Sequence, residues 1–109
     1  MVFGLDLSGR MAVVTGAGGI LCGMFARTLA QAGASVALLD INLETAERTA
    51  REIRAQGGNA AAYEVDVMDK EMLESVHARV LARLGPCDIL INGAGGNQAR
   101  ANTSKEYFE

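Results

Sequence analysis

The sequence predicts an α/β fold in which an open parallel sheet carries helices on both faces. Short apolar runs alternate along the chain with longer segments that have the hydrophobic spacing of amphipathic helices. The runs are continuously apolar, which is typical of parallel strands that are covered on both faces. Two of these runs lead directly into glycine-rich turns.

The first half of the chain supplies two strand–helix units. Gly33 ends the first predicted helix, and the pair Gly57-Gly58 ends the second. In chain order the elements are a strand at Met11–Thr15, a helix at Ile20–Ala32, a strand at Ser35–Leu39 that Asp40 closes, and a helix from about Leu43 to Gln56.

The second half continues this alternation. We expect a strand at Ala60–Val65, a helix that Asp69 caps and that runs to about Leu84, and a strand at Cys87–Ile91 before the glycine loop 92–96. One face of the helix carries an apolar stripe that should pack on the sheet. Its members are Met72, Leu73, Val76, Val80 and Leu84.

Length and composition fit one domain over residues 1–109 with a modest core. Half of the residues are hydrophobic and 21% are charged, with a net charge of −3 and no basic run. Neither nucleic acid nor a membrane is therefore an expected partner. No secretory signal is visible, and two cysteines in this pattern suggest free thiols in a reducing cytoplasm, which predicts a cytoplasmic protein.

The first glycine turn, at residues 16–19, predicts an anion site. It joins a strand to a helix, and the first amides of a helix lack internal partners and carry partial positive charge. Glycines also let the backbone approach a pyrophosphate closely. The alternative is a tight turn that only packs. Cys22 lies near this helix start, where its pKa could be lowered, but a packing thiol is the preferred interpretation.

Asp40 follows the second strand, 24 positions after Gly16 (40 − 16), which is close to the spacing seen in dinucleotide-binding folds. A carboxylate there can accept hydrogen bonds from ribose hydroxyls and would repel a 2′-phosphate. Its neighbours Ile41 and Asn42 are neutral, so we expect NAD rather than NADP. The alternative is that Asp40 caps the second helix or lies in solvent.

Three motifs together resemble the short-chain dehydrogenase/reductase family. They are the glycine turn that Thr15 opens, the pair Asp66-Val67 after the third strand, and the sequence Asn92-Gly93-Ala94-Gly95 after the fourth. The resemblance runs from about Leu7 to Gly96 and implies a Rossmann-type sheet with strand order 3-2-1-4. The turns further resemble the branch of the family that includes D-mannonate (fructuronate) oxidoreductases.

The resemblance also implies which residues contact the cofactor. Asp66 and Val67 would meet the adenine, while Asn92, Gly93 and Ala94 would pass beneath the adenine-side ribose towards the nicotinamide. The alternatives are a helix cap for Asp66 and a strand brace for Asn92. The residues implied along the pyrophosphate are Gly16, Gly18, Gly19, Ile20 and Leu21.

The chain departs from the family pattern in both glycine loops. The family has T-G-x-x-x-G-x-G in the first loop, so an alignment without gaps puts Ile20 and Cys22 at its last two glycines. A shift of one residue would let Gly19 make the closest approach to the cofactor. In the second loop, Gly93 stands at the second asparagine of N-N-A-G.

The family's catalytic Ser, Tyr and Lys are not matched in this sequence. The lysines are Lys70 and Lys105, and neither follows a tyrosine by four residues. The alternation of strands and helices also stops after Gly96. We therefore expect the N-terminal, NAD-binding part of a longer chain that is inactive alone and that self-associates through the uncovered edge of its fourth strand.

The function implied by the resemblance is interconversion of an alcohol and a carbonyl, with a small substrate in the parent protein that could be a sugar acid. One alternative is a dinucleotide-binding or sensing module that performs no catalysis. A methyltransferase, which also places an acid after its second strand, is a second alternative. No cysteine or carboxylate stands at metal-ligand spacing from His77 in the sequence, so no metal site is expected.

Overall fold

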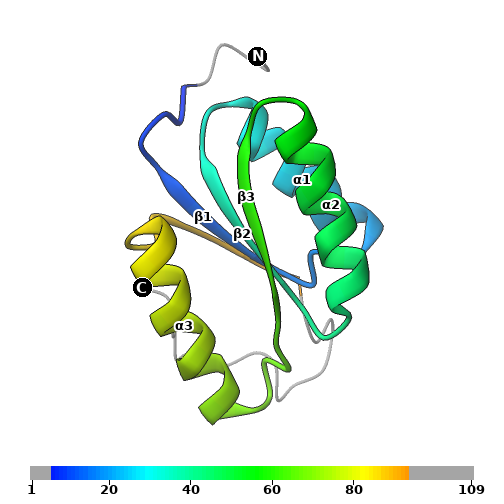
Figure 1. The fold of residues 1–109 in the computed structure, drawn as a ribbon, viewed down its shortest axis with the longest axis vertical. Coiled ribbons are helices and arrows are strands. Elements are labelled where there is room, and N and C mark those ends of the chain that lie inside the picture. Colours follow the sequence, from blue (N-terminus) through cyan, green and yellow to red (C-terminus); the bar gives the residue numbers. More distant parts are fainter. Residues whose placement is uncertain (1–5, 94–109) are drawn as a thin grey trace.

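A computed structural model describes residues 6–93, and its elements follow the predicted order (Figure 1). Cap residues account for several of the boundaries, since Asn42 and Asp69 bind first-turn amides of the second and third helices. The elements are β1 (Met11–Thr15), α1 (Ile20–Gln31), β2 (Ser35–Asp40), α2 (Leu43–Ala55), β3 (Asn59–Glu64), α3 (Lys70–Leu84) and β4 (Ile89–Asn92).

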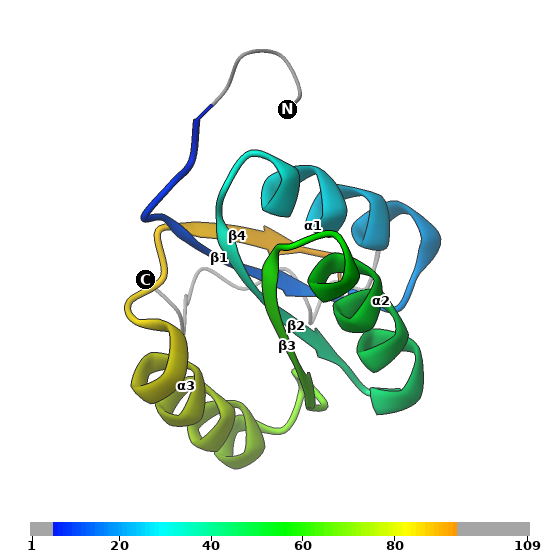
Figure 2. The ribbon, with the colours of Figure 1, turned by 45° about the horizontal axis from the view of Figure 1, so that its top comes forward.

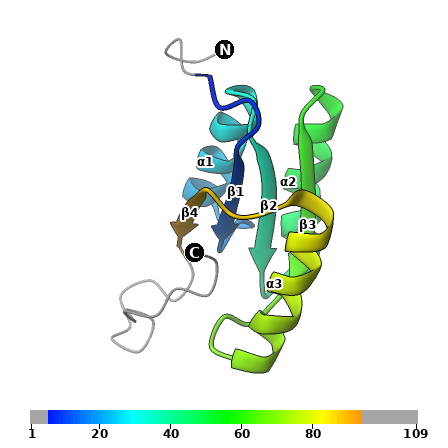
Figure 3. The ribbon, with the colours of Figure 1, turned by 90° about the vertical axis from the view of Figure 1, so that its left-hand side faces the viewer.

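The four strands form one parallel sheet in the order β3-β2-β1-β4, as predicted. Helices α1 and α2 cover one face of the sheet and α3 covers the other (Figures 2 and 3). This is the layered arrangement of a doubly wound α/β fold.

Each face of the sheet has its own apolar core because alternate residues of a strand point to opposite faces. Val14 and Val36 lie in the cluster with α1 and α2, whereas Val13 and Leu39 lie in the cluster with α3. The predicted stripe of α3 packs in that second cluster, with Leu73, Val76 and Val80 buried and Met72 and Leu84 partly buried.

The structure corrects the starts of two strands and several ends. Strands β2, β3 and β4 end at Asp40, Glu64 and Asn92 rather than at Leu39, Val65 and Ile91, and α1 ends at Gln31 rather than Ala32. Strand β3 begins one residue earlier than predicted, at Asn59, whose side-chain amide donates to Ser35 Oγ of β2 at 3.0 Å. Strand β4 begins at Ile89 rather than Cys87. The reason is that Asp88 joins β1 through its side chain as well as its backbone: its carboxylate accepts from Met11 N at 2.9 Å.

Strand β4 lies at one edge of the described sheet and is only half-buried, whereas every residue of β1 is buried. Ile89, Leu90 and Ile91 thus retain exposed apolar surface. Across the described part of the chain, no helix is both long enough and apolar enough to cross a membrane.

Candidate functional site

The carboxyl ends of β1, β2 and β4 meet at the same edge of the sheet. Thr15 is in register with Leu39 on one side and with Asn92 on the other. The chain leaves β1 towards β2, and β4 then adds on the opposite side of β1. Such a reversal of strand order opens a crevice where α/β proteins bind ligands.

Thr15 connects the starts of the two glycine loops. Its hydroxyl donates to Asn92 Oδ1 at 2.7 Å and accepts from Gly93 N at 3.0 Å. The bracing role considered for Asn92 is therefore confirmed. Sequence reasoning gave the Thr15 side chain no role, although its position at the end of β1 could have suggested one.

The first glycine turn leads into a helix whose N-terminus has no side-chain cap. Gly16 has φ of +68°, which favours glycine, and Gly19 is the N-cap of α1. The first turn of α1 carries no acidic residue, whereas α2 and α3 each have a side-chain cap and a glutamate there. Ile20 and Leu21, in that turn, are 87% and 62% exposed. The N-terminus of α1 is thus suited to binding an anion that is not part of the described chain.

The structure brings Asp40 into direct contact with the first glycine turn. One carboxylate oxygen accepts from Gly18 N at 2.7 Å and the other from Asn42 N at 2.8 Å. Asn42 supplies the cap of α2, so Asp40 does not have that alternative role. A Cβ at Gly18 would lie 2.9 Å from Asp40 Oδ2 and 2.8 Å from Thr45 Cβ, which explains the glycine.

Asp66 and Val67 follow β3, further along the same edge of the sheet. Asp66 Oδ1 accepts from Met68 N at 2.9 Å, and the amide of Asp66 donates to Met72 Sδ at 3.4 Å. Asp69 caps α3, so Asp66 is not needed for that purpose. Of the residues predicted in the second glycine loop, Asn92 and Gly93 are described and Ala94 lies outside the described residues.

Cys22 is a packing thiol rather than an activated one. Burial raises its pKa, and the carboxylate of Asp40 raises it further, opposite to the lowered value considered for a helix start. Cys22 and Cys87 are both free thiols, as predicted. Within residues 6–93, no cluster of three or more His, Cys, Asp or Glu side chains could hold a metal ion.

The fold and this edge of the sheet define an α/β protein of the nucleotide-binding class. Residues 10–109 match the family described as short chain dehydrogenase. The chain therefore belongs to the short-chain dehydrogenase/reductase family, and the methyltransferase alternative is not supported.

Relatives in sequence and structure agree with this assignment. An uncharacterized oxidoreductase of Haemophilus influenzae is 43% identical over 104 residues, which are 95% of this chain and 36% of the relative. A crystal structure of a provisionally named D-mannonate oxidoreductase of Haemophilus, with bound NAD, is 43% identical with a TM-score of 0.82, covering 96% of this chain and 38% of that one.

A third relative binds the phosphorylated cofactor. A metagenomic short-chain oxidoreductase in complex with NADP is 38% identical with a TM-score of 0.73, covering 77% of this chain and 38% of that one. The chain thus spans little more than a third of the length of these three relatives. All three are named as oxidoreductases, which does not favour a non-catalytic module.

Proposed function

We propose that this chain forms the NAD(H)-binding part of an oxidoreductase that interconverts an alcohol and a carbonyl. The observation that carries this proposal is the hydrogen bond from Gly18 N to Asp40 Oδ2. It joins the turn proposed for the pyrophosphate to the acid proposed for the ribose. Family membership and the NAD-bound relative support the same conclusion.

The residues present fit the adenosine half of NAD. The two oxygens of Asp40 each accept one backbone hydrogen bond, and an ionised carboxylate has about four lone-pair sites. Capacity thus remains for the two ribose hydroxyls. The uncapped start of α1 would receive the pyrophosphate at the amides of Ile20 and Leu21, because the amide of Gly19 already donates to the carbonyl oxygen of Gly16 at 3.0 Å.

Each part of the edge has a distinct task in this proposal. Asp40 orients the ribose, and Gly16 and Gly18 keep the turn close enough for backbone contact. Asp66 and Val67 would border the adenine, and the second glycine loop would guide the cofactor towards the nicotinamide end. When bound, the oxidised cofactor would accept a hydride and the reduced cofactor would donate one.

The substrate we propose is a sugar acid in the complete protein. The D-mannonate oxidoreductase relative supports it, as does the resemblance of both glycine loops to that branch. The groups that polarise the substrate and move its proton would be supplied from outside residues 6–93. The activity therefore belongs to the complete protein rather than to the described residues.

Substitution of Asp40 tests the cofactor assignment. Asp40→Ala removes the hydrogen bonds that the ribose hydroxyls would donate to the charged carboxylate. Hydrogen bonds to charged groups contribute about 1.5–3 kcal/mol each, so NAD binding should weaken by at least about tenfold. The preference for NAD over NADP should narrow, because the repulsion of a 2′-phosphate is lost. Isothermal titration of the chain with each cofactor measures both effects.

Glu74→Gln is the matched control, since it removes one exposed carboxylate from α3, which covers the face of the sheet opposite to α1. It should leave both affinities unchanged. Equal affinity of the unmutated chain for NAD and NADP would contradict the role given to Asp40.

A further inference from the structure

Two of the three departures from the family pattern, one from each glycine loop, contact each other. Cys22 stands at a family glycine position in the first loop, and Gly93 stands at a family asparagine position in the second. A Cβ placed on Gly93 would overlap Cys22 Sγ and would lie 3.1 Å from the carbonyl oxygen of Thr15. The thiol therefore occupies the space that a side chain at position 93 would need.

The contact is fixed from both sides. Gly93 N donates to the hydroxyl and carbonyl oxygens of Thr15, which hold the backbone of the second loop against the end of β1. Cys22 belongs to the first turn of α1 and packs on the apolar cluster under α1 and α2. Neither partner can move away without breaking its own packing or hydrogen bonds.

We propose that Cys22 and Gly93 form one positioning contact that sets the separation of the two glycine loops. In this chain the thiol of α1, rather than a side chain of the second loop, lies between the two loops. The consequence for NAD affinity rests on the proposed function, whereas the steric coupling does not. A larger group at 93 would push the start of α1 away from β4, displacing the amides proposed for the pyrophosphate.

A double substitution tests the coupling. Gly93→Asn alone should lower the melting temperature of the free chain and weaken NAD binding by at least about tenfold, the equivalent of about 1.4 kcal/mol. Cys22→Gly alone should change binding by less than about fivefold, because it only leaves a small void. Cys22→Gly with Gly93→Asn should bind NAD within about threefold of the unmutated chain and recover most of the melting temperature.

Gly58→Asn is the matched steric control. A Cβ at Gly58 would lie 2.7 Å from Ile53 Cγ2, in the turn between α2 and β3. This variant should lower the melting temperature while leaving the NAD affinity of the folded chain unchanged. If Gly93→Asn behaves in the same way, the contact is purely structural and the positioning role is wrong.

Other outcomes are also decisive. If the double variant is no better than Gly93→Asn, the two residues are not coupled and the proposal is overturned. If Gly93→Asn does not fold, a folded double variant still demonstrates the coupling, and an unfolded one contradicts it. If the unmutated chain does not bind NAD, the proposed function fails, while melting temperatures of the free variants still test the contact.

Discussion

Asp40 and Thr15 are the side chains that hold the two glycine turns in place. Asp40 binds the amide of Gly18 through its carboxylate, and Thr15 uses one hydroxyl both to donate to Asn92 and to accept from Gly93. Both residues end a strand, so the rigid sheet fixes their positions. A binding site whose turns are anchored in this way has little ordering left to do when a ligand arrives.

The thiol of Cys22 should react with alkylating agents only at raised pH. Burial and the charge of Asp40 raise its pKa, so less thiolate is present at a given pH. The rate of alkylation by iodoacetamide should therefore reach its midpoint at a higher pH than in the urea-unfolded chain. Peptide mass spectrometry follows Cys22 and Cys87 separately.

Asp40→Asn supplies the control for this measurement. It removes the charge, so the midpoint for Cys22 should move to lower pH, while Cys87, whose pKa is raised chiefly by its own burial, should not respond. A midpoint for Cys22 below that of the unfolded chain would show that the helix start outweighs burial.

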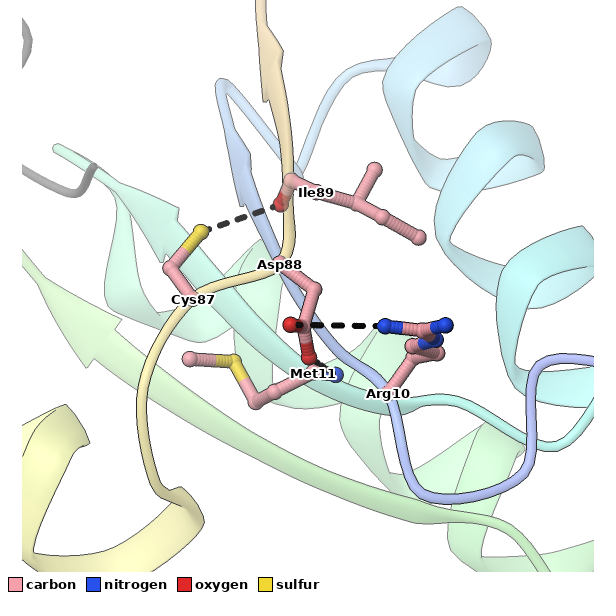
Figure 4. Close-up of polar contacts among 5 residues, drawn as sticks. All are labelled: Arg10, Met11, Cys87, Asp88 and Ile89. Carbon is pink, nitrogen blue, oxygen red and sulfur yellow. Dashed lines mark hydrogen bonds and ion pairs between the residues drawn. The ribbon is translucent and has the colours of Figure 1, made fainter.

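At the scale of elements, β4 is attached to β1 at both ends. Thr15 binds the carboxyl end of β4 through Asn92. At the amino end, Asp88 Oδ2 accepts from Met11 N, Asp88 N donates to Met11 O at 2.8 Å, and Arg10 lies 3.9 Å from the same carboxylate (Figure 4). These bonds hold a strand that pairs with one neighbour, β1, within residues 6–93.

Removal of the Asp88 side chain should loosen β4. Asp88→Ala leaves Met11 N without its acceptor, which costs about 1–3 kcal/mol, so amides of β4 should exchange with deuterium at least about fivefold faster. Hydrogen exchange measured by NMR checks this.

Arg10→Ala is the control for that experiment. The Arg10–Asp88 pair is long and exposed, and such pairs contribute little to stability. Exchange in β4 should stay almost unchanged. An equal effect of both substitutions would mean that the ion pair, rather than the Met11 hydrogen bond, holds the strand.

The sequence was enough to locate the elements because strands, helices and caps are local patterns. Asp69 precedes an amphipathic stripe, and the structure confirms it as the cap of α3. The start of β4 was predicted wrongly because Asp88 binds Met11, 77 residues away, through its side chain, and no local pattern encodes that bond.

At the scale of the whole molecule, the strand order was predictable because right-handed crossovers and the family resemblance allow few alternatives. The meeting of Asp40 with the first turn followed from the same reasoning. The contact of Cys22 with Gly93 did not, because it depends on how closely β4 packs beside α1. Cys22 and Gly93 were both visible as departures from the family pattern, but nothing in the sequence paired them.

Self-association of the chain through the uncovered edge of β4 stays a prediction. The half-buried residues of β4 provide the apolar surface that motivates it.

We propose that NAD binds along the carboxyl ends of the strands, and amide chemical shifts recorded while the ¹⁵N-labelled chain is titrated with NAD show whether it does. We predict that the chemical shifts change most in the first glycine turn, at Asp40 and at the carboxyl end of β4. Met11 and Asp88, at the amino ends of their strands, should be unaffected. Changes centred on the amino ends of the strands, or no changes at millimolar NAD, would exclude NAD binding at this site.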